Sequence, residues 1–182
     1  MHPDTILSGL ARDLRMIRRS YGSSNAEILA LLPKPLEVFS IMNTIVQWHG
    51  RNGVDLSEFE CAVYGLVSLD VSATNYSTEN FLLGDAADDV PPMRLLLADA
   101  SPALAARFQR LIDIFPGYLQ ARNHAERQRL FNLDDEDAED AISEKVSAWN
   151  QEYNALPFVR DEALIRHVNE GFLALKIQWP KE

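Results

Sequence analysis

The sequence contains a single cysteine, and this scarcity excludes two kinds of stabilising site. Cys61 has no partner for a disulfide within the chain, and a structural zinc site built on cysteine ligands is excluded in the same way. One thiol in 182 residues agrees with a reducing compartment. No apolar run approaches the roughly 18 residues that a membrane-spanning helix needs, and the first residues lack the features of a signal peptide. We therefore expect a cytoplasmic protein that does not enter a membrane.

Positive charge is also scarce in this chain. It has 17 Lys and Arg against 27 Asp and Glu, which gives a formal net charge of -10. Because nucleic acids are bound through clustered cations that displace counterions from phosphates, we expect no nucleic-acid partner. We interpret two local arginine clusters as solvated helix faces or ion pairs between subunits rather than anion sites: Arg12, Arg15, Arg18 and Arg19, and Arg122, Arg127 and Arg129.

Motifs that hold metals or nucleotides are missing as well. The chain has no G-x-S-x-G, P-loop or G-x-G-x-x-G segment, which argues against the common hydrolase, nucleotide triphosphatase and dinucleotide-binding classes. Its four histidines include no pair at helical spacing, and the acidic run at residues 133–140 lacks the central Gly of a calcium loop. We expect no metal and no cofactor.

The sequence does have helical periodicity along almost its whole length. Apolar residues recur every three or four positions and no segment alternates strictly, so we predict an all-α protein, a compact multi-helix bundle formed by one domain, residues 1–182. Helices are expected from residue 6 to near 22, over 26–32, from 36 to 48–50, over 58–69, 76–83, 102–115 and 118–131, from the acidic run at 133–140 to before Pro157, and over 164–175. Asp55 or Ser57 would cap the fourth helix, and Gly84 would end the fifth in a left-handed conformation. The acidic loop 85–92, closed by a proline pair, would separate these five helices from a second helical half at residues 101–176.

His49 and Cys61 are the side chains of most chemical interest before any family is considered. His49 ends a predicted helix, where it either lies beside a site or satisfies the last carbonyls of that helix. Cys61 falls within a helix beside two glutamates, whose negative charge would raise the pKa of its thiol. We therefore expect an inert, buried thiol rather than a nucleophile.

Residues 28–84 carry a family resemblance in three consecutive stretches. Pro35 to Phe39 is similar to a P-x-x-L-x-x-F helix, DLSEFECAVYGLV at 55–67 to a helix that starts like L-x-x-x-x-R-E, and residues 70–84 to A-N-G-C-x-Y-C-x-x-x-H-x-x-x-G. Together they resemble the alkylhydroperoxidase D-like part of the carboxymuconolactone decarboxylase superfamily. Residues 131–157 are similar to the closing helix of that family, so about half of the chain is covered. The resemblance implies a helical bundle that associates through helix faces into a homo-oligomer.

The chain departs from the family where the chemistry would occur. When Gly84 is taken as the anchor, the two redox cysteines fall on Ala73 and Tyr76, and the histidine falls on Asn80. The glutamate of the proton relay falls on Cys61, with Glu60 next to it. A peroxidase reaction needs an attacking thiolate and a resolving thiol, and neither is present at these positions. Peroxidase activity is therefore not expected.

The resemblance implies a non-redox member that keeps a pocket between helices and binds a small ligand there. The residues expected to line that pocket are Glu60, Cys61, Tyr76, Asn80 and His49. Glu60 would act as a base in a cofactor-free decarboxylation or isomerisation, and Tyr76 and Asn80 would orient the ligand from one helix face. Alternatively, Tyr76 and Asn80 satisfy backbone groups where their helix begins.

A second hypothesis follows from the charge. Carboxylates concentrate at residues 85–89 and 134–140, so the chain is alternatively an acidic interaction module, such as an immunity or inhibitor protein that covers a basic partner.

Overall fold

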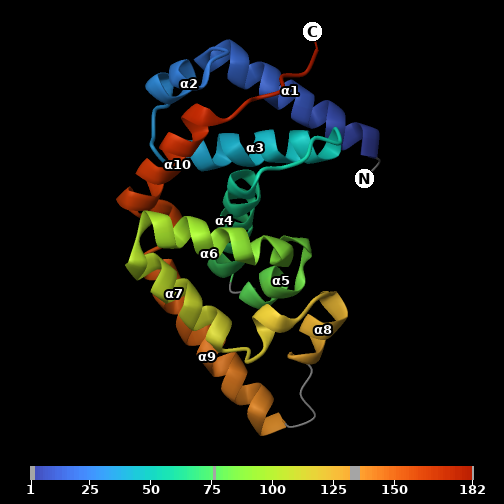
Figure 1. The fold of residues 1–182 in the computed structure, drawn as a ribbon, viewed down its shortest axis with the longest axis vertical. Coiled ribbons are helices and arrows are strands. Elements are labelled where there is room, and N and C mark those ends of the chain that lie inside the picture. Colours follow the sequence, from blue (N-terminus) through green and yellow to red (C-terminus); the bar gives the residue numbers. More distant parts are fainter. Residues whose placement is uncertain (1–2, 76, 132–135, 182) are drawn as a thin grey trace.

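The computed structural model describes residues 3–75, 77–131 and 136–181, and within these ranges it contains helices but no strand (Figure 1). The prediction of an all-α bundle is confirmed. The α-helices are α1 (Pro3–Tyr21), α2 (Asn25–Leu31), α3 (Glu37–Arg51), α4 (Glu58–Thr74), α5 (Thr78–Leu83), α6 (Val90–Ala100), α7 (Pro102–Asp113), α8 (His124–Arg129), α9 (Glu136–Ala155) and α10 (Glu162–Ala174). Three short 3-10 helices join them: η1 (Asp85–Asp89), η2 (Tyr118–Gln120) and η3 (Phe158–Arg160).

α4 is the central helix of the bundle and packs against α3, α5, α6 and α9. Figure 1 shows it running from the α3 layer down through the middle of the molecule. Ser57 caps it as predicted: the Ser57 hydroxyl accepts from the backbone N–H of Glu60, and the Glu60 side chain accepts from the backbone N–H of Ser57. The predicted end at Leu69 is wrong, because α4 continues to Thr74. This stretch has no Gly or Pro, and burial of both Leu69 and Ala73 on one face favours a continued helix.

α6 crosses α4 at Gly65, where the two helices approach closely. A Cβ on Gly65 would lie 2.4 Å from Met93 Sδ, so a side chain at this position would push the helices apart. The predicted loop at 85–92 is wrong, because η1 leads directly into α6 and the proline pair lies in the first turn of that helix. The loop therefore does not separate two halves, since one buried core contains residues from both sides of it.

Gly84 does not adopt the left-handed conformation expected from the sequence. Its φ is -79°, and a Cβ there would lie 2.6 Å from the carbonyl oxygen of Asn80. Glycine is thus required at this position because the backbone of Asn80 is close, and not because φ is positive.

The predicted polar helix at 118–131 is wrong except for α8. Gly117 takes φ +89° and turns the chain, after which Tyr118 is buried and donates from its hydroxyl to the carbonyl of Leu82 at 2.7 Å. Arg127, expected on a solvated face, is buried and contacts the Asp88 carboxylate at 2.8 Å. One carboxylate of the acidic stretch 85–89 is therefore engaged within the chain.

Residues 175–181 follow α10 without regular secondary structure and lie against α2 and α3; Figure 1 shows this segment passing α2 and α1. The Asn25 amide donates to the carbonyls of Phe172 and Leu175 at 2.6 and 2.7 Å. The Trp48 indole N–H donates to the carbonyl of Gln178 at 2.7 Å. The segment is thus attached to helices from the first third of the chain.

Candidate functional site

His49 and Glu60 form a buried pair where α3 and α4 meet. His49 lies in the last turn of α3 and Glu60 in the first turn of α4, and the short connection between these helices includes Gly53 at φ +70°. Nδ1 of His49 lies 2.6 Å from Oε1 of Glu60. The two residues are only 2 and 4% exposed. Both were predicted as site residues, and the structure brings them together.

The second oxygen of Glu60 is held by the cap of α4. Oε2 accepts from the Ser57 backbone N–H at 3.0 Å and from the Ser57 hydroxyl at 2.7 Å. Burial raises the pKa of Glu60, but the hydrogen bonds from Ser57 and His49 stabilise the carboxylate and together lower the pKa below its ordinary value. Glu60 is therefore ionised at neutral pH.

The hydrogen-bond partners of His49 define its tautomer. Nε2 lies 3.0 Å from the backbone nitrogen of Gln178, which only donates, so Nε2 accepts. In the neutral ring the proton is then on Nδ1, where the Glu60 carboxylate accepts it. A carboxylate that orients an imidazole through Nδ1 and leaves Nε2 as the acceptor is the arrangement found in general-base sites.

This pair lies in the wall of a pocket of about 500 Å³, which we call the dyad pocket. Besides the pair, its lining comprises Val54, Asp55, Ser57, Phe59, Gly171, Ala174, Leu175, Lys176 and Gln178. Pockets of this size hold small organic ligands. Because Gln178 supplies both the wall and the donor to Nε2, a ligand that engages His49 must replace that N–H.

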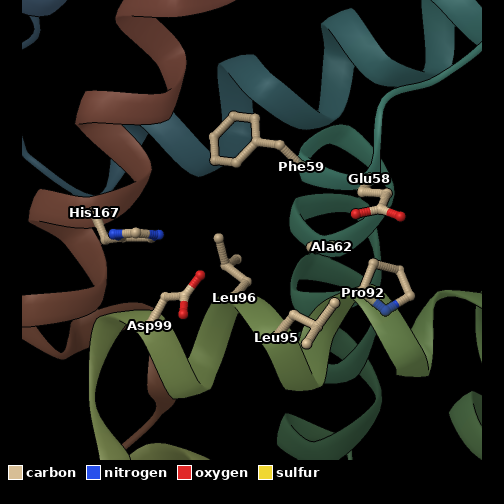
Figure 2. Close-up of a pocket in the computed structure, with 8 residues that line it drawn as sticks. All are labelled: Glu58, Phe59, Ala62, Pro92, Leu95, Leu96, Asp99 and His167. Carbon is tan, nitrogen blue, oxygen red and sulfur yellow. The ribbon is translucent and has the colours of Figure 1, made fainter.

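Phe59 separates the dyad pocket from a smaller one. The smaller pocket, of about 190 Å³, lies between α4, α6 and α10 (Figure 2). In Figure 2, His167 and Asp99 enter it from α10 and α6, and Glu58 lies across from them. None of the residues predicted for the site lines it. Within the described ranges, no group of three or more His, Cys, Asp or Glu is placed to hold a metal ion.

Cys61 is half-buried and lies apart from the dyad pocket lining. Burial raises the pKa of its thiol, and the negative charges of Asp89 and Glu60 raise it further. The sequence predicted a raised pKa from the neighbouring glutamates, and the direction agrees. The contribution of Asp89 was missed because it comes from η1, where only the fold brings it to α4. Burial in turn raises the pKa of Asp89 to about 6, although the Cys61 thiol donates a hydrogen bond to it.

The structure does not bring Asn80 to His49 and Glu60. Thr74, at the far end of α4, lies about 21 Å from Glu60 along the helix axis, given a rise of about 1.5 Å per residue. Asn80 follows on α5 and is exposed. Tyr76 lies outside the described residues. Of the predicted site residues, His49 and Glu60 therefore lie at the start of α4, whereas Asn80 lies beyond its end.

A second pocket, of about 430 Å³, lies at that other end of the α3–α4 pair, and we call it the Asp70 pocket. It is lined by Leu36, Phe39, Ser40, Asn43, Val67, Asp70, Thr74, Pro157, Val159 and Arg160. The Asp70 carboxylate accepts from the buried Tyr153 hydroxyl at 2.8 Å. Sequence reasoning missed Asp70, although a lone acidic residue between the apolar Leu69 and Val71 was a usable signal.

No helix in the described part of the chain has the length and apolar character needed to cross a bilayer. Comparisons of the chain with protein-family models, with curated proteins and with solved structures gave no match, so the site is interpreted from its own geometry.

Proposed function

We propose that the chain is a non-redox, alkylhydroperoxidase D-like protein that binds a small ligand in the dyad pocket and uses His49 and Glu60 for proton transfer. The observation that carries this proposal is the buried hydrogen bond between His49 Nδ1 and Glu60 Oε1 in a pocket wall. It supports a ligand site because the pair presents an oriented acceptor, Nε2, toward the segment that closes the pocket.

In this proposal His49, rather than Glu60, is the base. Both oxygens of Glu60 already accept hydrogen bonds, so its role is to fix the tautomer of the ring and to stabilise the imidazolium once a proton arrives. The reaction that suits one such base without a cofactor is a proton transfer at carbon. In an isomerisation His49 would take a proton from one carbon and return it to another, and in a decarboxylation the imidazolium would give a proton to the carbanion that remains when CO₂ leaves.

The Gln178 backbone N–H occupies the position of the acidic ligand group. A ligand with a weakly acidic O–H or C–H would take its place when residues 175–181 move away from α3. Gln178→Pro tests this, because proline lacks the N–H that reaches Nε2 but keeps the carbonyl that accepts from Trp48. Gln178→Ala is the matched control, since it retains both backbone groups.

The readout is the side-chain ¹⁵N resonance of His49 during titration with small phenols and enolisable ketones. We expect a probe to shift the Nε2 resonance in the parent chain and to bind at least tenfold more tightly to Gln178→Pro, with Gln178→Ala unchanged. If no probe in the panel perturbs Nε2 in either the parent or Gln178→Pro, the proposed function is wrong.

The homo-oligomer expected from the resemblance is also part of this proposal. Its support is the face of α6 and α7 where Leu95 is 60% exposed beside a groove of about 560 Å³ that includes Ala98, Ala105 and Ala106. Exposed leucine beside small residues suits the packing of a helix from a second copy. Light scattering should give a multiple of the chain mass, and Leu95→Lys should reduce it to one chain. A single-chain mass for the parent protein would contradict this assignment.

A further inference from the structure

The Asp70 pocket contains a half-buried carboxylate, Asp70, and a half-buried amide, Asn43. The Asn43 side chain makes no hydrogen bond to other described residues, and the polar Ser40 and Thr74 side chains of the same lining are exposed. Asp70 makes one side-chain hydrogen bond, to Tyr153, and no ion pair within the part of the chain that the structure describes. Half-buried polar groups are usually paired, so the unpaired Asn43 amide in the same lining as the Asp70 carboxylate is suited to contact with a ligand.

We propose that the Asp70 pocket binds an α-amino acid with an apolar side chain. Asp70 is a half-buried carboxylate whose hydrogen-bond partner among the described residues is the Tyr153 hydroxyl, and an ammonium group is the ligand chemistry that it recognises. Arg160 lies at the rim of the same pocket and supplies the positive charge for a ligand carboxylate. A molecule that satisfies both charges carries an ammonium and a carboxylate close together.

The remaining walls fit the rest of such a ligand. Phe39 and Val67, from α3 and α4, and Val159, from η3, form an apolar surface beside the charged pair. Asn43, in the same lining, offers both a donor and an acceptor. A volume of about 430 Å³ accommodates an amino acid and excludes a polypeptide domain.

Electrostatics of Asp70 agree with this assignment. Burial raises its pKa, while the Tyr153 hydrogen bond and the charge of Arg160 act in the opposite direction without cancelling the effect of burial. A bound ammonium would supply the missing stabilisation of the carboxylate. The inference goes beyond the proposed function, because the two pockets lie at opposite ends of the α3–α4 pair and share no lining residue.

Isothermal titration calorimetry with three matched probes tests the proposal. The probes are L-leucine, isoamylamine, which lacks the carboxylate, and 4-methylpentanoate, which lacks the amine. We expect L-leucine to bind at least tenfold more tightly than either analogue. Isoamylamine that binds as tightly as L-leucine, or no heat from any of the three, would overturn the assignment.

Two variants locate the site. Asp70→Asn retains an oxygen that accepts from Tyr153, so the fold is expected to persist, and it should weaken L-leucine at least tenfold. Arg160→Gln should weaken L-leucine but not isoamylamine. Asp99→Asn, an exposed carboxylate on α6, is the control and should leave the affinity for L-leucine unchanged. L-leucine bound equally well by Asp70→Asn and the parent chain would show that the ligand binds elsewhere.

Discussion

The ring of Phe59 lies directly over the backbone of Gly171, where a Cβ would come within 2.3 Å of the ring. This contact joins the first turn of α4 to α10 and forms the wall between the dyad pocket and the pocket of Figure 2. A wall that depends on the absence of one methyl group makes both pockets sensitive to a single substitution.

We expect Gly171→Ala to displace the Phe59 ring and to destabilise the fold by about 1–3 kcal/mol, the usual cost of overpacking. Urea denaturation measures this change. Gly9→Ala on α1 is the control, because nothing lies within 4 Å of its Cβ, and there alanine should stabilise the helix by about 0.5–1 kcal/mol. Equal effects of the two substitutions would contradict the close contact.

Glu60→Gln should destabilise the protein by about 1–3 kcal/mol, because a buried donor or acceptor is left unsatisfied. If the glutamine oxygen accepts from Ser57, the glutamine NH₂ faces the Nδ1–H of His49, so two donors meet. If the His49 ring instead moves its proton to Nε2, that N–H faces the backbone N–H of Gln178, and two donors meet there. Denaturant unfolding gives the free energy of the variant. Glu58 is an exposed neighbour in the same turn, and Glu58→Gln should leave the free energy of unfolding nearly unchanged. A loss of stability as large as that of Glu60→Gln would show that the negative charge, and not the buried hydrogen bonds, causes the effect.

Asp89→Asn should stabilise the protein at neutral pH but not in acid. The folded-state pKa of Asp89 is raised from 3.8 to about 6, so ionisation of this group costs stability. Well below pH 3.8 the group is protonated in both states and costs nothing; the cost begins as pH rises through 3.8 and is complete above pH 6. Solvent screens a half-buried group, so we expect about 1 kcal/mol, or about 2–4 °C in Tm, at pH 7.

Melting curves of the parent chain and Asp89→Asn at pH 4 and pH 7 measure this difference. Asp99→Asn, further along α6 and exposed, should show no such pH dependence. A Tm difference for Asp89→Asn that is the same at both pH values would rule out the ionisation as its cause.

Tyr153→Phe should raise the pKa of Asp70 further, because the lost hydroxyl stabilises the carboxylate. The side chain is fully buried, and loss of its hydrogen bond should cost about 1 kcal/mol of stability. Carboxyl ¹³C shifts followed by NMR titration report the pKa directly. Tyr118→Phe removes a hydrogen bond to the Leu82 carbonyl instead, so it should leave Asp70 unchanged.

Much of the fold could be predicted from periodicity and caps. Ser57 caps α4 as expected because its capping box is entirely local, and the helix predicted to start at residue 102 does begin at Pro102. α6 escaped prediction because Pro91 and Pro92 suit a loop as well as a first helical turn. Gly65, which permits the crossing of α6, has meaning only once the partner helix is placed.

The candidate site was predictable only in part. His49 and Glu60 are 11 residues apart, and the connection between α3 and α4 is short enough to bring them together. Asn80 was placed with them because family spacing does not show that α4 extends without a break. Gln178 could not have been predicted from residue type, since its contribution to His49 is a backbone N–H that any residue except proline would supply.

The contact between Gln178 and His49 also sets an order of events during synthesis. A ribosome that has released α1 to α4 has made the imidazole and its carboxylate, but the group that pairs with Nε2 is translated 129 residues later. Until then the ring nitrogen faces water or whatever solute is nearby. The nascent chain therefore lacks the backbone partner of this acceptor until Gln178 has been added.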